Sequence, residues 1–487
     1  IKMSFYIYDV GFLIVFSALV TWFLYSRRAN LKREGIMYLY RTQVGIKFID
    51  YVGTKYKKTL SVLGFLAVVS GYFLMAAMMY FLYKLVYLYL FVPEIVRAIK
   101  IPPLMPLIPY LPEAFDISFL PPFYFTYWII AIAVIALFHE FAHGIIARRY
   151  GIRIMTTGFG FLGPFLAAFV EPDEKQMEEK TKYQQIAVLS AGVFTNLVLA
   201  ILFFLMLSGF FILTYAPAGA MFNTYTPGIV EVGAITMIGG ISVENPTSEN
   251  LNSIISRNNL TDDLVLGSNG HSVSFIGVNV GEKVYYTNVE SLKGQLNGNG
   301  DKVALYEDFP AINAGLRGVI VEFEGVKINT HEDLGVELDS VSPGDEVKVV
   351  TKDGDETLEY DIVLGENEDG QAIMGIGYYV SGGKMLSKVT DFFNFFKKPA
   401  TFYEPRFNVD LVVFIYNLIW WLALINLSVA LVNMWPVAIF DGGRMFMLSV
   451  WAVTGSEKFA MLMFKLATYL ILGSLVLLMV GWGFAMF

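Results

Sequence analysis

Six long apolar stretches constrain the fold of this chain more than any other feature. They lie near residues 6–25, 60–92, 123–147, 183–215, 409–436 and 459–487 and carry almost no charge. A run of about 18 or more such residues can cross the hydrocarbon core of a bilayer as a helix. Charged residues make up only 16% of the chain, whereas a soluble domain contains about 25%. The sequence therefore predicts a polytopic α-helical membrane protein with about six transmembrane helices.

An acidic, polar region is inserted between the fourth and fifth apolar stretches. Residues 216–384 contain 26 acidic and nine basic side chains, so the remainder of the chain is net positive. This contrast predicts an extramembrane α+β region within a membrane protein, and its negative charge disfavours nucleic acid as a partner. The chain has no cysteine, which excludes Cys-ligated zinc, thiol catalysis and disulfides.

Lysine and arginine in the short loops predict the orientation in the membrane. Residues 27–58 contain nine of them and residues 148–183 contain six, but residues 93–123 contain only two. Because basic loops stay on the cytoplasmic side, we expect the first two segments there, together with the tight loop 437–458. The acidic region then faces the opposite side. Two arginines directly follow the first apolar stretch and indicate a retained anchor rather than a signal peptide.

Three further segments are apolar or aromatic but do not read as spanning helices. Residues 158–170 (GFGFLGPFLAAFV) are short and rich in glycine and proline, so we expect a re-entrant strand pair or loop that protein covers. Residues 36–56 and 392–396 have aromatic side chains with basic ones among or beside them. Each fits either a position among the lipid headgroups or packing against protein.

Two of the four histidines form a motif that is typical of zinc sites. The motif is His139-Glu140-Phe141-Ala142-His143, at the end of an apolar stretch. Its spacing puts both imidazoles on one helix face, as a zinc ion requires of two ligands. Glu140 is then placed to act as general base for a water molecule. Ionisable side chains inside a membrane span are costly and by default indicate function; a buried structural cluster is the alternative.

A catalytic zinc ion needs a third protein ligand, and the other histidines do not supply it. His271 and His331 lie in the acidic region, and we assign them no role. We therefore expect a carboxylate at membrane depth. Asp441 is the best candidate, because it follows an apolar helix and precedes two glycines that allow a sharp turn. A helix N-cap is the alternative role for Asp441. In the predicted topology both motifs lie at cytoplasmic helix ends, where they can meet.

Together these motifs resemble those of the site-2 protease family of intramembrane zinc metalloproteases. The similarity covers residues 123–215 and 409–450, and it rests on His139-Glu140-x-x-His143, Gly192-x-x-x-Asn196 and Asn433-x-x-Pro436-x-x-x-x-Asp441-Gly442-Gly443. By this resemblance, His139, His143 and Asp441 hold Zn²⁺ and Glu140 activates water.

The resemblance also implies an activity and its partners. Asn196 and Asn433 take substrate-binding or oxyanion-supporting roles, for which interhelical hydrogen bonding is the alternative. The reaction is hydrolysis of peptide bonds in or near transmembrane segments of membrane-protein substrates, as in regulated intramembrane proteolysis. The implied partners are such substrates and the lipid bilayer. In this setting the active site lies near the cytoplasmic side and the acidic region on the other side.

The second half of the acidic region resembles a PDZ domain. Residues 311–377 contain Ala314-Gly315-Leu316, a hairpin over 319–328, a helix near 331–338 and a strand after Pro343-Gly344-Asp345. A weaker echo of this order near 217–308 favours two tandem units, and a single unit with a long insertion is the alternative. PDZ domains bind chain ends by adding a strand to a sheet edge. We therefore expect peptide ligands or substrate filtering, with a rigid plug as the alternative.

These observations divide the chain into seven parts. They are N-terminal transmembrane helices with an interfacial segment (1–122), a catalytic membrane core with the histidine helix, the re-entrant segment and the following helix (123–215), a first PDZ-like unit (216–308), a second PDZ-like unit (309–384), an amphipathic connector (385–408), a catalytic membrane core with the Asp-Gly-Gly motif (409–458) and a C-terminal transmembrane helix (459–487).

Two other functions compete with a zinc metalloendopeptidase. One is a membrane-anchored PDZ scaffold with a structural or inactive metal site. Glu140 argues against it, because a purely structural site needs no general base. The other is a divalent-metal transporter, which requires more polar residues along a path than the few asparagines of the spans provide.

Overall fold

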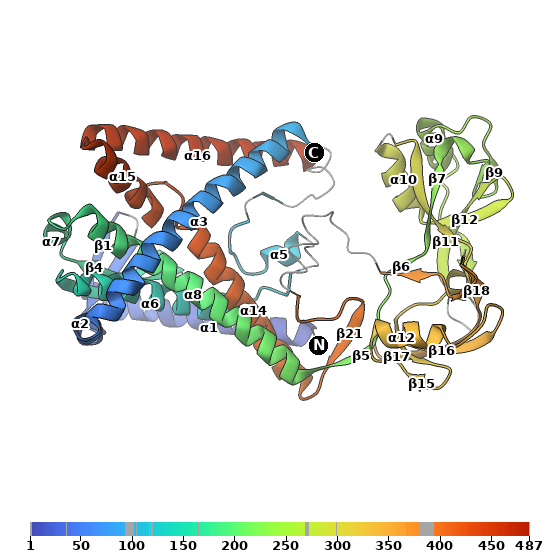
Figure 1. Ribbon diagram of the computed structural model, residues 1–487, viewed down its shortest axis with the longest axis horizontal. Helices are drawn as coiled ribbons and strands as arrows, with labels where there is room; N and C mark the ends of the chain where they lie inside the picture. The colour runs from blue at the N-terminus through green and yellow to red at the C-terminus, as the bar shows by residue number, and fades with distance from the viewer. Residues whose placement is uncertain are drawn as a thin grey trace. The chain divides into compact units, whose positions relative to one another are not determined.

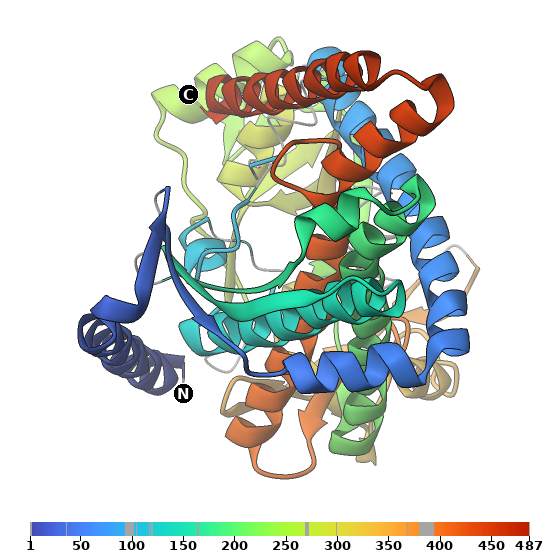
Figure 2. The ribbon, with the colours of Figure 1, turned by 90° about the vertical axis from the view of Figure 1, so that its left-hand side faces the viewer.

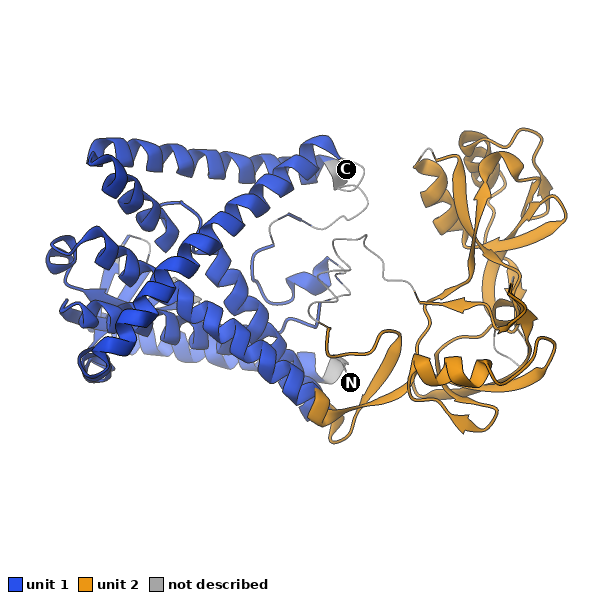
Figure 3. Cartoon of the chain, viewed as in Figure 1, with its two compact units in different colours: residues 1–211, 410–487 blue, residues 212–409 orange. Residues whose placement is uncertain are grey.

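The computed structural model divides the chain into two units (Figure 3), and each unit has apolar clusters of its own. Unit 1 is Ile1–Phe211 with Asp410–Phe487, and unit 2 is Ile212–Val409. The structure describes residues 2–35, 37–92, 102–103, 105–115, 117, 120–162, 165–267, 272–298, 300–367, 369–378 and 394–486. His271 and residues 385–393, which begin the predicted connector 385–408 and include 392–393, lie outside the described residues.

Six helices in the described part of the chain are long and apolar enough to cross a membrane, which is the number that the sequence predicts. They are α1 (Lys2–Ser26), α3 (Lys57–Phe91), α6 (Phe125–Arg149), α8 (Lys182–Thr214), α14 (Val409–Val432) and α16 (Glu457–Met486). Shorter helices are η1 (Arg28–Asn30), α2 (Ile46–Lys55), α5 (Leu111–Ala114), α7 (Glu174–Glu178) and α15 (Asp441–Thr454). The helices α15 and α16 pack as a hairpin, and α16 also contacts α3 (Figure 1).

A four-stranded antiparallel sheet lies beside α6 (Figure 2). Its strands, in order across the sheet, are β1 (Leu31–Glu34), β2 (Met37–Thr42), β3 (Ile154–Leu162) and β4 (Phe165–Pro172). The described residues of the segment 158–170, predicted as a strand pair or loop, thus form a strand pair, and residues 163–164 lie outside the described part. Gly158 pairs with Phe169 on one side and with Arg41 on the other. The β1–β2 hairpin extends this pair and was not predicted. β4 is an edge strand and packs along α6.

A carboxylate from α1 holds the start of α6. The Asp9 side chain is 1% exposed. Its Oδ2 accepts a hydrogen bond from the Phe125 backbone N–H at 2.8 Å, and its Oδ1 accepts one from that of Thr126 at 2.9 Å. The Thr126 hydroxyl, at 2.5 Å, and the Tyr110 hydroxyl also donate to it. The first N–H groups of a helix have no partner within the helix, so Asp9 satisfies two of them and ties α1 to α6.

Unit 2 contains two larger sheets. One has the order β7-β13-β12-β11-β8-β9, with β10 on β11, and the other has the order β17-β16-β14-β5-β21, with β15 on β14. The first comprises β7 (Pro227–Glu231), β8 (Met237–Ile238), β9 (Ile241–Ser242), β10 (Leu264–Leu266), β11 (Val273–Val280), β12 (Lys283–Thr287) and β13 (Lys302–Glu307). The second comprises β5 (Tyr215–Ala220), β14 (Val319–Phe323), β15 (Val326–Lys327), β16 (Glu346–Asp353), β17 (Glu356–Val363) and β21 (Thr401–Pro405).

Short helices and small strand pairs complete unit 2. They are η2 (Val232–Ala234), α9 (Ser248–Arg257), α10 (Val289–Asn297), α11 (Pro310–Asn313), α12 (His331–Leu338), β6 (Thr224–Tyr225) with β20 (Ile376–Gly377), and β18 (Gly365–Glu366) with β19 (Ala372–Ile373). One apolar cluster includes Ile238, Leu251 and Leu292, and a second includes Ile320 and Leu334. The region is therefore rich in strands, as expected, while its PDZ-like assignment and the domain bounds stay predictions.

Candidate metal centre

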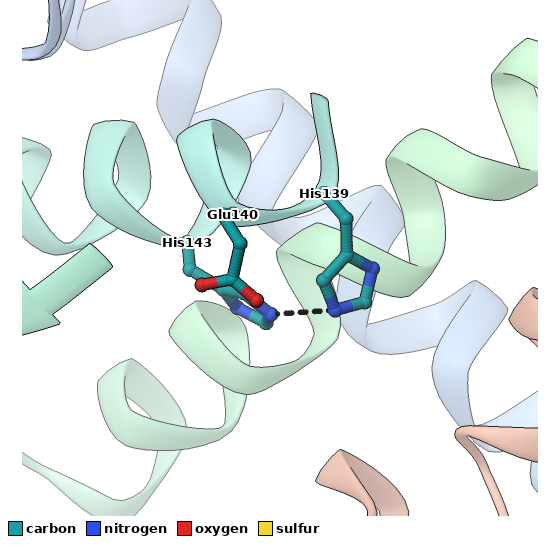
Figure 4. Close-up of side chains that lie close together, drawn as sticks. All are labelled: His139, Glu140 and His143. Carbon is teal, nitrogen blue, oxygen red and sulfur yellow. Dashed lines mark hydrogen bonds between the residues drawn. The ribbon is translucent and has the colours of Figure 1, made fainter. Parts of the chain in front are cut away.

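The two motif histidines face each other on one side of α6 (Figure 4). The Nε2 atoms of His139 and His143 are 3.0 Å apart. The Glu140 carboxylate lies on the same side, and one ligand atom from each of the three residues falls within 4.8 Å of the others. The helix is apolar from Phe125 up to this point, so its predicted span carries three polar side chains on a single turn. Such clustering is costly in a span unless the groups act together.

Asp441 completes the group from the other end of the chain. Its Oδ2 lies 3.3 Å from Nε2 of His139 and 3.5 Å from Nε2 of His143. The residue is the first of α15, and Phe440 occupies the N-cap position. The predicted alternative role as N-cap therefore does not apply to Asp441, whose carboxylate faces the imidazole pair.

The residues around Asp441 explain why its motif needs two glycines. A Cβ on Gly442 would lie 2.5 Å from the Met434 carbonyl carbon and oxygen, and a Cβ on Gly443 would lie 2.2 Å from the Val437 oxygen. Both contacts are too short for any side chain. The Gly442 N–H also donates to the Asn433 carbonyl at 2.8 Å. The chain before α15 therefore folds back tightly on itself and fixes the position of the carboxylate.

The geometry and chemistry of the three donors fit a zinc ion. Tetrahedral zinc with nitrogen and oxygen ligands keeps neighbouring donor atoms about 3.3 Å apart, and the separations here are 3.0, 3.3 and 3.5 Å. Both imidazoles also have a partner at their other nitrogen. Nδ1 of His143 lies 2.7 Å from the Val188 carbonyl oxygen, and Nδ1 of His139 lies 3.0 Å from the Asn196 side-chain amide. Partners of this kind orient metal-binding histidines.

The helix α8 supplies these partners and passes unusually close to the imidazoles. A Cβ on Gly192 would lie 2.4 Å from Nε2 of His143 and 2.6 Å from Cε1 of His139. Only a residue without a side chain fits there. Asn196 follows one turn later, is completely buried, and keeps its Oδ1 without a hydrogen-bond partner among the described residues.

A cavity of about 500 Å³ opens onto the candidate metal-binding residues. Its lining includes His139, Glu140, His143, Asn433 and Asp441. The edge strand β4 forms another wall, and the backbone N–H of Val170 donates to Oε2 of Glu140 at 3.1 Å. Five of the six predicted site residues thus surround one cavity, and Asn196 contacts His139 from outside it. His331, at the start of α12 in unit 2, lies outside this site.

Several cavity residues were not singled out in the sequence. Arg41 on β2 places its Nε 3.2 Å from Oε2 of Glu171, and the Thr156 hydroxyl donates to the same oxygen at 2.6 Å. The Thr156 hydrogen bond, followed by the Arg41 guanidinium, holds the pKa of Glu171 below its ordinary value. Arg444, in the first turn of α15, also lines the cavity. The only sequence signal for Arg41 is its place in a basic segment.

Comparison with known proteins identifies a family and a relative. The sequence profile of peptidase family M50 matches residues 127–478, which include all the predicted site residues. An uncharacterized protein of Methanocaldococcus jannaschii is 30% identical over 201 residues, covering 39% of this chain and 49% of the relative. The chain therefore spans about half the length of the relative it matches.

Proposed function

Because the chain belongs to peptidase family M50, the site-2 protease family, we propose that it is a zinc metalloendopeptidase that cleaves membrane proteins in or near their transmembrane segments. The observation that carries the proposal is the meeting of three side chains that can bind zinc, beside a further carboxylate. The Nε2 atoms of His139 and His143 approach Oδ2 of Asp441, and Glu140 projects to the same side as the imidazoles.

The residues of the site have separate tasks in this reaction. A zinc ion held by His139, His143 and Asp441 supplies Lewis acidity for the scissile carbonyl and makes water more acidic. Glu140 accepts the proton of the attacking water and then donates it to the leaving amine. A single carboxylate suffices for both transfers, because the proton returns in the second step.

The substrate is proposed to bind as an added strand. A helical substrate keeps its carbonyl groups in its own hydrogen bonds, so it must unwind before attack. The N–H of Val170 points toward Glu140 and away from β3. In an antiparallel strand alternate residues point the same way, so the N–H of Ala168 also lies on the free edge of β4. An unwound segment that pairs there passes the cavity, where Asn433 is placed to contact it.

The basic segments around the site support a proposal for the side of the membrane on which it lies. The basic segments 27–58 and 148–183 contain β1 to β4, and they support a site near the cytoplasmic side. Unit 2 then belongs to the other side, where its PDZ-like region is proposed to filter substrates or bind peptides. Such an arrangement suits regulated intramembrane proteolysis, in which access to the site is controlled outside the membrane.

Metal analysis and a cleavage assay together test this proposal. The purified full chain is expected to retain zinc, and His143→Ala to lose it. Glu140→Gln is expected to retain zinc and to leave a membrane-spanning substrate intact. Glu178→Gln, an exposed acid on α7, is the control that should cleave normally. Cleavage by Glu140→Gln at the wild-type rate overturns the assignment of Glu140 as the general base. Zinc without cleavage by the wild-type chain favours the scaffold alternative.

A further inference from the structure

Three residues of α8 at intervals of four contact the histidine pair. Val188, Gly192 and Asn196 lie on one face of the helix because four residues make about one turn. The Val188 carbonyl meets Nδ1 of His143, Gly192 leaves room for both rings, and the Asn196 amide meets Nδ1 of His139. This face of α8 therefore forms a wall behind the metal-binding atoms.

The contact between Val188 and His143 fixes where the proton of that imidazole lies. A carbonyl oxygen only accepts hydrogen bonds, so Nδ1 of His143 must carry the proton and donate it over 2.7 Å. The neutral ring then has its lone pair at Nε2. This is the nitrogen that faces His139 and Asp441. The backbone of α8 thus prepares His143 as a ligand, whatever side chain stands at position 188.

His139 needs the same arrangement, but it has only a side chain to provide it. If its Nε2 is a ligand, its Nδ1 carries the proton and requires an acceptor. Among the described residues, the group that meets Nδ1 is the amide of Asn196, whose nitrogen is placed 3.0 Å away. The oxygen of that amide is buried and has no partner among the described residues. A half-turn of the amide exchanges its oxygen and nitrogen, so the oxygen accepts the proton of Nδ1 and gains the partner it lacks.

We infer that Asn196 is a positioning residue of the metal centre: its amide oxygen accepts a hydrogen bond from Nδ1 of His139 and holds this imidazole with Nε2 toward the ion. The inference deepens the proposed function and rests on it. It gives Asn196 a role through His139 rather than through the substrate, because the side chain has no exposed surface from which to touch one.

Two substitutions at Asn196 test whether it positions His139 or contacts the substrate, and zinc affinity is the measured quantity. Asn196→Leu keeps the approximate size but removes the acceptor, and loss of such a partner lowers metal affinity by about 10–100-fold. Asn196→Asp keeps an acceptor, and a carboxylate behind a histidine makes the ligand more basic. Zinc affinity is therefore expected to fall at least about tenfold in the first variant and to stay within about threefold of wild type, or to rise, in the second.

Asn426→Leu is the matched control. Asn426 is also completely buried, lies in the apolar helix α14 and likewise has an Oδ1 without a partner among the described residues. Its amide nitrogen donates to the Leu422 carbonyl within its own helix. Any loss of zinc affinity that comes merely from replacing a buried asparagine in a span should appear in this control too.

The measurement is a competition for zinc between the metal-free full chain in detergent and a chromophoric chelator. Helix content by circular dichroism identifies a variant that has not folded, and Asn196→Ala then replaces Asn196→Leu, since it also lacks the acceptor. Wild-type zinc affinity in the folded Asn196→Leu or Asn196→Ala variant overturns the inference. A loss of zinc affinity in Asn196→Asp as large as in those variants overturns it too. Failure of the wild-type chain to bind zinc instead overturns the proposed function.

Discussion

The Nε2 atom of His139 lies 3.3 Å from Oδ2 of Asp441, although the whole of unit 2 separates the two residues in the chain. The two histidines come from α6 and the carboxylate from the start of α15. An ion bound between them joins two parts of unit 1 that no peptide link holds together directly. Its binding free energy therefore contributes to the stability of the folded unit.

Replacing Asp441 tests this closure. Asp441→Ala leaves only two protein ligands and is expected to abolish stable zinc binding and to lower the thermal unfolding temperature of the zinc-loaded protein. Metal content after dialysis and the unfolding temperature in detergent are the measurements. Asp410→Ala is the control, because Asp410 is an exposed carboxylate in the first turn of α14. Equal zinc content in both variants contradicts the ligand assignment.

The close approach of α8 predicts a strong effect of a single methyl group. A Cβ at position 192 would lie 2.4 Å from Nε2 of His143, so Gly192→Ala must displace at least one of the two imidazoles. We expect zinc affinity to fall by about tenfold or more. Gly209→Ala introduces the same group in the same helix, where nothing lies within 4 Å, and should bind zinc normally. Normal affinity in Gly192→Ala would show that α8 stands further from the ring.

The bond from Asp9 to α6 predicts a stability effect far from the metal. Asp9→Ala leaves the N–H groups of Phe125 and Thr126 without their partner, and each unsatisfied buried group costs about 1–3 kcal/mol. We expect a lower unfolding temperature and faster proteolysis of α1 in detergent. Thr21→Ala, which removes an exposed hydroxyl bonded only within α1, is the control. An unchanged unfolding temperature in Asp9→Ala contradicts the tie between the two helices.

The free edge of β4 predicts a backbone-specific effect on cleavage. Ala168→Pro removes one N–H from that edge while sparing the bonds to β3, and proline is tolerated on edge strands. We expect slower cleavage of a transmembrane substrate with unchanged zinc affinity. Ala168→Val enlarges the side chain but keeps the N–H, so it should cleave faster than the proline variant. Equal rates in both variants argue against strand addition at this edge.

The helices and the close grouping of His139, His143 and Asp441 were predictable because their signals are local or chemically rare. Hydropathy over some 20 residues identifies a span without knowledge of its neighbours, and all six predicted stretches are helical. Histidines one turn apart in an apolar helix admit few explanations. Asp441 could be chosen because very few carboxylates occur at membrane depth, and the structure does bring it to the imidazoles.

The missed features depend on partners that the sequence does not display. Asp9 bonds to backbone N–H groups, which every residue but proline has, so nothing in the sequence marks them as its partners. The pairing of β2 with β3 joins residues more than a hundred positions apart, and residues 36–56 alone indicate only aromatic and basic character. The closeness of Gly192 to the imidazoles likewise depends on how α8 packs against α6.

The insertion of unit 2 between the ligands has a consequence for biosynthesis. A ribosome completes both histidines and the base well before it reaches the codon for Asp441, and all of unit 2 is translated in the interval. During that time the nascent polypeptide contains His139, Glu140 and His143 but not Asp441. A site that requires Asp441, as proposed here, therefore cannot form until translation has passed the whole of unit 2.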